Sequence, residues 1–230
     1  MRRPRLRWLL VAAFLVVALG VGAVIWYVFG GSSPGKPHLS STATTDVAPG
    51  SGTPVGSWTL LRAKDVYVGY RIQELFAGDT IHKDAVGRTP TVDGTMTVTP
   101  GQVASVVVNA DLRNLTSGRA ARDDYIHSHA IESDTFPTAH FELASPIAIP
   151  ASVRPGTKLH LSAPGRLTLH GVTRDVTAAL DARWNGSTID VVGTAPIVLA
   201  DYGIQAPQTA VTSVGDHGTF ELQLRFRHLP

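Results

Sequence analysis

The chain contains no cysteine at any of its 230 positions. Disulfide bridges, thiolate zinc ligands, a cysteine nucleophile and a lipid-modified cysteine are therefore excluded. The sequence also lacks the Gly-x-Ser-x-Gly elbow of many hydrolases and the Walker loop of nucleotide-binding proteins. These absences favour a binding or structural protein over an enzyme, and we expect no catalytic residues, no metal and no cofactor.

Acidic residues are missing from the N-terminal part of the chain, where none precedes Asp46. Basic residues are present there, because four arginines come before the first long apolar run: Arg2, Arg3, Arg5 and Arg7. The formal net charge of the whole chain is +2. Without these four arginines, 16 lysines and arginines face 18 acidic residues, so the positive charge belongs to the tail. The remainder shows no basic stripe of the kind that binds nucleic acid, and we expect no such partner.

Charge is absent altogether from residues 8–29, a run of 22 residues. At about 1.5 Å per residue, a helix of this length crosses a hydrocarbon core of roughly 30 Å. Arginines precede the run, and Trp8, Trp26 and Tyr27 lie near its two ends, as aromatic residues do at membrane interfaces. We therefore expect a cytoplasmic tail over residues 1–7, then a single-pass membrane anchor, with the rest of the chain extracytoplasmic. A cleaved signal peptide, the alternative, has a shorter apolar region of about 7–15 residues.

Large apolar residues are scarce between residues 30 and 56, a segment that is rich in glycine, serine, proline and threonine. Such a segment buries too little apolar surface to order itself, so we expect a flexible linker. The folded domain then covers residues 57–230, a length that suits one core.

The domain is dominated by short runs in which apolar and polar residues alternate. In "TFELQLRF", Phe220, Leu222, Leu224 and Phe226 share one face of a strand. Further strands are expected at residues 65–72, 94–99, 103–112, 140–144, 158–170, 174–182 and 188–199. The connections are too short for helical crossovers, so the strands pair antiparallel. A sheet of this size closes on itself or folds into a sandwich, and the stretch at residues 73–86 is expected to be a helix or a loop.

One helix is expected over Ser117–Glu132. Ser117 can cap its N-terminus, and Pro137 disfavours helix just beyond its end. Within this stretch, Asp123 is expected to pair with Arg119 or Arg122 and so to fix the helix on the sheet.

The same region gathers histidines, which raises the question of a metal site. On a helix the side chains of His127 and His129 diverge by about 200°, so they cannot easily share an ion. Glu132 and His140 are further candidate ligands only because they are near in sequence. A solvated helix face and the polar rim of a ligand entrance are the other interpretations of this stretch.

Three motifs in order resemble the YceI-like domain family: "RDDYIHSHAIESDTFPTAHFEL", "GRLTLHGVTRDVTAALDA" and "PIVLADYGIQAP". The resemblance covers essentially the whole domain. It implies an eight-stranded, antiparallel, lipocalin-like barrel with a short helix over it. It also implies binding of a long apolar chain, such as a polyisoprenoid, an isoprenoid quinone precursor or a fatty amide. The family is not known for one clear catalytic activity.

Some family positions carry over to this chain and others do not. Arg122 and Asp123 match the family's Arg-Asp motif, and Phe136, Pro137 and Phe141 match the aromatic stretch after it. The histidines that many members have in their first strands are missing from "KDVYVGYRIQE". The Gly-Arg-Thr in "VGRTPTVDG" is similar to that of membrane-anchored, actinobacterial-type members.

We therefore expect an all-β barrel, tethered to the cell membrane, that holds an isoprenoid or other long-chain lipid in its interior. Small inward residues such as Ala178 and Ala195 leave room for it. We expect the ligand-binding residues to be Tyr70, Phe141, Leu167, Leu169, Phe220 and Leu222, with Arg122 meeting a polar head at the rim. The alternatives are a structural or interaction barrel of the cell envelope without a ligand, or a metal protein that uses the histidines. Whether the chain forms a homodimer stays open.

Overall fold

The computed structural model describes residues 33–39, 53–76, 81–150, 152–208 and 212–229. The chain divides into two units, residues 1–34 and 35–230, and the barrel belongs to the second. The predicted anchor at residues 8–29, the tail before it and most of the predicted linker lie outside the described residues. Within the described ranges, no helix is both long enough and apolar enough to cross a membrane.

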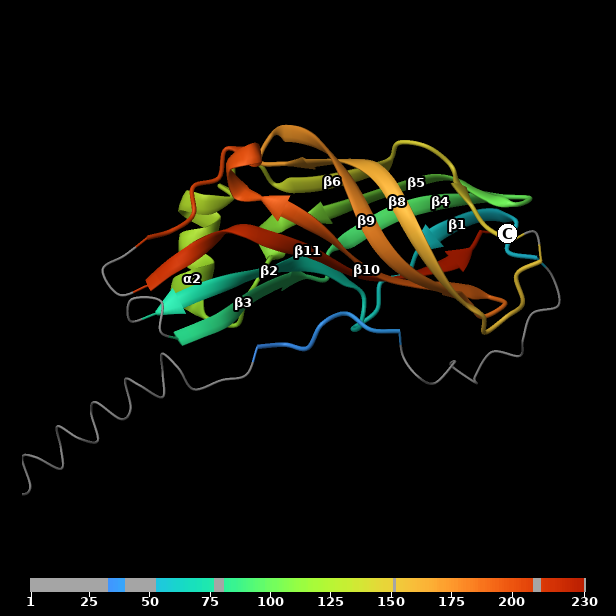
Figure 1. Ribbon diagram of the computed structural model, residues 1–230, viewed down its shortest axis with the longest axis horizontal. Helices are drawn as coiled ribbons and strands as arrows, with labels where there is room; N and C mark the ends of the chain where they lie inside the picture. The colour runs from blue at the N-terminus through green and yellow to red at the C-terminus, as the bar shows by residue number, and fades with distance from the viewer. Residues whose placement is uncertain (1–32, 40–52, 77–80, 151, 209–211, 230) are drawn as a thin grey trace, which may run out of the picture. The chain divides into compact units, whose positions relative to one another are not determined.

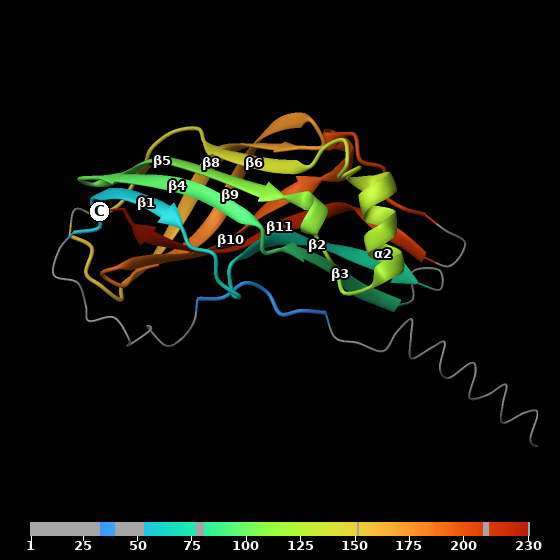
Figure 2. The ribbon, with the colours of Figure 1, turned by 180° about the vertical axis from the view of Figure 1, so that it is seen from behind.

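The described elements are almost all strands (Figures 1 and 2). The strands are β1 (Gly56–Leu60), β2 (Tyr67–Phe76), β3 (Ile81–Thr89), β4 (Val92–Thr99), β5 (Gln102–Asp111), β6 (Thr138–Leu143), β7 (Ile147–Ala148), β8 (Lys158–Leu169), β9 (Val172–Trp184), β10 (Thr188–Val198) and β11 (Thr212–His228). The helical elements are η1 (Leu112–Asn114), α2 (Ala120–Tyr125), the π-helical turn η2 (Ile126–Ala130) and η3 (Leu199–Tyr202).

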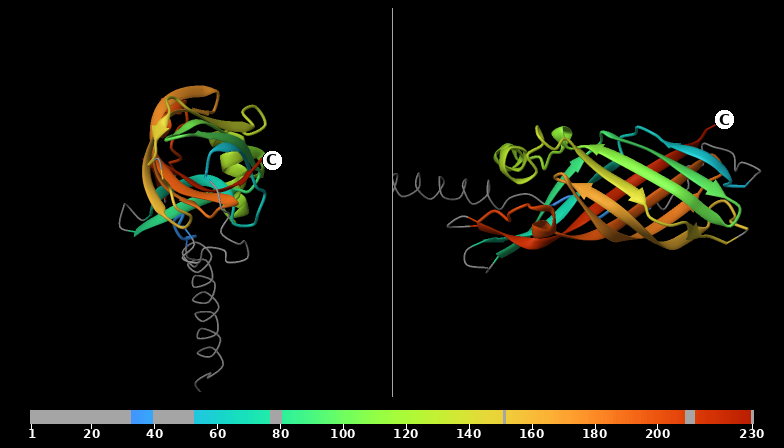
Figure 3. Two further views of the ribbon diagram at one scale, coloured as in Figure 1. Left: turned by 90° about the vertical axis from the view of Figure 1, so that its right-hand side faces the viewer. Right: turned by 90° about the horizontal axis from the view of Figure 1, so that it is seen from above.

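Eight of these strands close into a barrel, as predicted. The order around the ring is β1-β4-β5-β6-β8-β9-β10-β11, and β1 pairs again with β11. Every described pairing is antiparallel, which confirms the second part of the prediction. Figure 3 shows the ring end-on in its left view. Closure removes most of the unpaired edge that an open sheet would expose.

Of the three remaining strands, β7 pairs with β5, and β2 and β3 form a hairpin attached to the ring. β11 is 17 residues long, and one of its edges has two partners. This edge pairs with β2 over Thr212–Gln223 and with β1 near the end of the strand. β3 then pairs with β2. This hairpin replaces the helix or loop expected at residues 73–86, and that expectation was wrong.

A tight hairpin joins β8 to β9. His170 and Gly171 form its turn, and both have positive φ, at 51° and 72°. Two consecutive residues with positive φ are what the tight type I′ hairpin turn requires. The turn sets the register that brings Leu167, opposite Arg174, onto the inner face of the barrel.

The predicted helix exists but begins later and changes character. It runs as α2 from Ala120 to Tyr125 and continues as the π-helical turn η2. Its N-cap is Arg119, which makes no side-chain capping bond, so the prediction that Ser117 caps the helix was wrong. The helix lies at one end of the barrel, beside β2 and β3 (Figures 1 and 2).

Candidate ligand-binding cavity

The barrel encloses a cavity with an apolar lining. All 28 described residues that line it are alanine, valine, leucine, isoleucine, methionine, proline, phenylalanine or tryptophan. The space that the centre of a water-sized sphere can reach is about 110 Å³. One water needs only about 10–15 Å³ by this measure, so the cavity holds far more than a single solvent molecule. An apolar space of this kind offers water no hydrogen-bond partner among its described side chains, and it therefore favours an apolar occupant.

The lining of the cavity extends along the barrel strands. Along β8 its lining runs from Leu159 to Leu167, which at about 3.3 Å per residue corresponds to roughly 26 Å. Its width comes from small side chains: Ala178 and Ala195 line it and pack together with Ala163. An eight-stranded barrel is just wide enough for side chains or one small ligand, so this space favours a slim, chain-like occupant.

Four of the predicted ligand-binding residues line this cavity, namely Phe141, Leu167, Phe220 and Leu222. One of them also shapes it, because the ring of Phe141 lies over Gly165 where a Cβ atom would overlap it. Sequence reasoning missed other lining residues, including Trp184 and Val191, although they obey the same alternation.

The other two apolar predictions, Leu169 and Tyr70, lie outside the cavity lining. Leu169 is 8% exposed and belongs to the packed core. The ring of Tyr70 lies over Gly87, and its hydroxyl is buried with no hydrogen-bond partner among the described residues. Burial, with smaller contributions from Asp123 and Glu74 and opposed by Arg122, raises the pKa of Tyr70 well above its usual value.

The predicted head-group residue Arg122 also lies outside the cavity lining, and it already has an anionic partner. Its Nε donates to Oε1 of Glu74 at 3.0 Å, and its Nη2 to Oε2 at 2.5 Å. The side chains of Arg122 and Glu74 are 19% and 11% exposed. This bidentate ion pair joins α2 to β2 and so holds the helix against the β2–β3 hairpin.

Asp123 fastens the start of the helix instead of pairing with Arg119 or Arg122, so that expectation was wrong. One carboxylate oxygen accepts from the backbone N–H and the hydroxyl of Ser117, and the other accepts from the hydroxyl of Thr116 at 2.6 Å. Burial raises the pKa of Asp123, but these hydrogen bonds lower it by more, so that it lies below its ordinary value of 3.8.

The histidines of this region have separate partners. His127 contacts Ser133 Oγ through Nδ1 and the carbonyl of Leu115 through Nε2. His140 contacts Asn109, and His129 stacks on Tyr125. Across the described residues, no group of three or more histidine, aspartate or glutamate side chains is placed to hold a metal ion.

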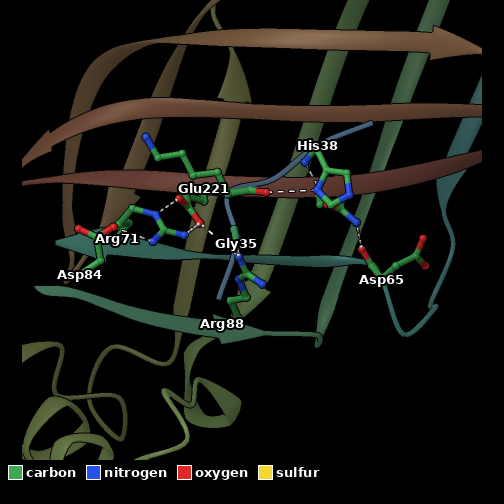
Figure 4. A network of polar contacts seen from close by, with 9 residues as sticks. Gly35, His38, Asp65, Arg71, Asp84, Arg88 and Glu221 are labelled. Carbon is green, nitrogen blue, oxygen red and sulfur yellow. Dashed lines mark hydrogen bonds and ion pairs between the residues drawn. The ribbon is translucent and has the colours of Figure 1, made fainter. Parts of the chain in front are cut away.

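A second polar cluster lies on the outer face of β2 and β11, away from the cavity (Figure 4). Glu221 is only 1% exposed although it points outward. Arg71 donates to it through Nε at 2.5 Å and Nη2 at 3.3 Å, and also to Asp84 at 2.9 Å. Arg88 approaches the same carboxylate at 3.5 Å. Burial opposes the charge of Arg71, but hydrogen bonds to both carboxylates raise its pKa overall. The alternation along the two strands places Arg71 and Glu221 on the outer face, but it does not show that the two side chains bury one another.

Residues 35–38 lie across this outer face (Figure 4). The backbone carbonyl of Gly35 accepts a hydrogen bond from Arg88, and the N–H of His38 approaches Gln223 Oε1 at 3.5 Å. Gln223 in turn donates to the carbonyl of Asp65 at 2.9 Å. This described part of the predicted linker is therefore held against the barrel by polar contacts.

Comparison with known proteins agrees with this architecture. The model of the YceI-like domain family matches residues 63–226. A UPF0312 protein of Vibrio cholerae serotype O1 is 34% identical over 128 residues, which are 52% of this chain and 64% of the relative. A UPF0312 protein of Vibrio vulnificus is 32% identical over 133 residues, covering 54% of this chain and 67% of the relative. The chain thus spans less than two thirds of the length of the V. cholerae relative.

Two solved structures share the fold. A polyisoprenoid-binding domain from Saccharophagus degradans, implicated in plant cell wall breakdown, superposes with a TM-score of 0.58 at 16% identity, covering 75% of this chain and 98% of that domain. BcnA of Burkholderia cenocepacia gives a TM-score of 0.52 at 20% identity, covering 68% and 95%. At these identities the likeness concerns the barrel and not its contents.

Proposed function

The chain belongs to the YceI-like domain family, and on that basis we propose that it is a membrane-tethered, extracytoplasmic binding protein. Its barrel would hold the tail of an isoprenoid or another long-chain lipid, and it would act by binding without catalysis. The observation that carries this proposal is the barrel cavity whose described lining residues are all apolar.

Burial supplies the affinity in this proposal. Each methylene removed from water contributes about 0.8 kcal/mol, so a dozen contribute about 10 kcal/mol before the cost of ordering the ligand is subtracted. A polar side chain in the middle of the cavity would oppose this gain, and none of the described lining residues is polar. The ligand class is further supported by the S. degradans domain, which is named for polyisoprenoid binding.

The tether and the location rest on the sequence. Arginines before an uncharged run of 22 residues support a signal anchor at residues 8–29, with the tail at 1–7 inside. Residues 30–56 would connect it to the domain at 57–230, outside the cytoplasm. Membership of a membrane-anchored, actinobacterial-type subgroup stays a prediction.

Lipid extraction from matched variants tests the proposal. The full chain, Ala178→Trp and Ala179→Trp are purified in parallel, extracted with organic solvent and compared by mass spectrometry. Ala178 lines the cavity, whereas its neighbour Ala179 is exposed, so the two variants add the same ring inside and outside. We expect an acyl or isoprenoid species with the wild type and with Ala179→Trp that is lost in Ala178→Trp.

Detergent and bulk lipid should bind all three proteins alike. The informative quantity is therefore the difference in extracted lipid between the three proteins. Thermal unfolding of each variant shows that the barrel is intact. Equal lipid content in all three, with all three folded, would contradict a ligand in the cavity. That outcome would favour a structural or interaction barrel without a ligand.

A further inference from the structure

The hydrogen-bond ladder of the barrel wall is incomplete along one seam, between β9 and β10. The ladder between β9 and β10 ends at the pair Ala179 and Thr194, although β9 begins seven residues earlier and β10 continues for four more. Pro196 lies in that continuation and has no N–H to donate to a ladder. Figure 1 shows the two strands diverging toward the end of the barrel that carries η3.

The inner face of β9 leads from the cavity to solvent at this seam. Residues 174, 176, 178 and 180 alternate onto one face, since side chains of a strand repeat every two residues. Leu180, Ala178 and Val176 line the cavity. Ala178 is buried, Val176 is half-buried and Arg174, the next residue on this face, is exposed. The cavity-facing side of β9 therefore reaches water between Val176 and Arg174.

Arg174 is a cation with no ion-pair partner among the described residues. Its described polar contact is a hydrogen bond to the carbonyl of Thr173 at 3.2 Å. The neighbouring acid Asp175 lies on the opposite face of the strand. Arg122, by contrast, already donates to Glu74 through two nitrogens. Of these two arginines, Arg174 is the one free to meet an anion.

The lining of the cavity determines where a polar head group can lie. A head group inside would lose its hydration without gaining a hydrogen bond from the apolar lining. It must therefore stay at a mouth, where water and a charged side chain are available. Arg174 is on the inner face of β9 at such a mouth.

We propose that the ligand is a long-chain amphiphile with an anionic head, a carboxylate or a phosphate, which enters through the β9–β10 seam and is held by Arg174 at its mouth. The inference rests on the proposed lipid-binding function. It names the head-group chemistry and the route, and it moves the head-group contact from Arg122 to Arg174.

Binding of matched ligands to the full chain tests the head group. The probes are geranylgeranyl phosphate, palmitate and the neutral alcohol geranylgeraniol, and quenching of tryptophan fluorescence reports binding because Trp184 lines the cavity. We expect Arg174→Gln to weaken the phosphate or the carboxylate about tenfold or more, the loss of one charge-assisted hydrogen bond, and to leave the alcohol unchanged. Whichever anion is affected identifies the source of the charge.

The control variant is Arg166→Gln. Arg166 is also exposed, lies on the adjacent strand β8 and pairs with Glu142 on the outer face, so its loss should change no affinity. If Arg174→Gln weakens the alcohol as much as the anions, or weakens neither, the head-group assignment is overturned. Geranylgeraniol binding that is lost in Ala178→Trp would keep the proposed function intact in that case. If none of the probes binds the wild type, both proposals fail.

The route has its own test. Val176→Phe narrows the seam from inside, and Thr177→Phe places the same ring on the exposed outer face. Stopped-flow mixing should show slower association with Val176→Phe and unchanged association with Thr177→Phe. Equal association rates would mean that the ligand enters elsewhere, for example beside Ile149 and Val153, which also line the cavity.

Discussion

The outer-face cluster makes a strong prediction about stability, through the substitution Glu221→Gln. This change keeps the shape of a side chain that is 1% exposed but removes its charge. Arg71, whose side chain is 10% exposed, then loses its closest anionic partner. Arg88 loses its contact with the same carboxylate at 3.5 Å. Breaking a buried ion pair from one side costs about 3–5 kcal/mol. Because Asp84 still accepts from Arg71, we expect the lower end, about 3 kcal/mol.

The assay is unfolding of the full chain, followed by far-UV circular dichroism. For a unit of this size, about 1 kcal/mol shifts the midpoint temperature by roughly 2–4 °C, so the expected fall is roughly 6–12 °C. In urea the midpoint should fall while the m-value stays constant, which shows that stability and not compactness has changed.

A matched control separates burial from charge alone. Glu142→Gln breaks the pair with Arg166 at 2.9 Å, whose side chains are 46% and 55% exposed. Exposed pairs contribute about 0–1 kcal/mol, so this variant should unfold close to the wild type. If Glu221→Gln also lies within about 0.5 kcal/mol of the wild type, the claim that the buried carboxylate stabilises the β2–β11 face is wrong.

Three further predictions concern the helix, the cavity and the buried tyrosine. The pKa of Asp123 is lowered in the folded state, so its carboxylate stabilises the protein above its ordinary pKa of 3.8 and loses this effect as the pH falls through the lowered value. Urea unfolding of Asp123→Asn should therefore show a loss of about 1–2 kcal/mol at about pH 7 that shrinks steadily as the pH falls below 3.8. Gly165→Ala drives a Cβ atom into the ring of Phe141 and should lower the free energy of unfolding by about 1–3 kcal/mol in the same assay. Tyr70→Phe removes a buried hydroxyl without a described partner, so calorimetry should show an unchanged or higher midpoint, and ligand affinity should not change because Tyr70 lies outside the cavity lining.

Period-two alternation was enough to predict most of the barrel, because one face of each ring strand is buried. It failed at residues 73–86, where β2 continues and β3 begins. β3 is a peripheral strand whose first residues, Ile81 and His82, are exposed, so no face there needs to be apolar. Asp84 of β3 accepts a hydrogen bond from Arg71, and its charge obscures the alternation of apolar and polar residues further.

Alternation also separates inside from outside without locating the cavity along the barrel. Leu167 and Leu169 share a face of β8, yet only Leu167 lines the cavity, since the core fills the space around Leu169. Arg122 posed a different problem, because its partner Glu74 lies 48 residues away on another element. Only the folded chain shows that this arginine is paired, whereas Arg174 has no ion-pair partner among the described residues.

The incomplete ladder between β9 and β10 has a consequence for how the protein behaves among its own copies. Strand segments with one unpaired edge are templates for strand addition and so for aggregation. Here each side carries a feature that discourages it: Pro196 cannot donate a ladder hydrogen bond from β10, and Arg174 with Asp175 places opposite charges on β9. Pro196, which cannot donate to a ladder with β9, therefore also disfavours the addition of a strand from a second chain at this edge.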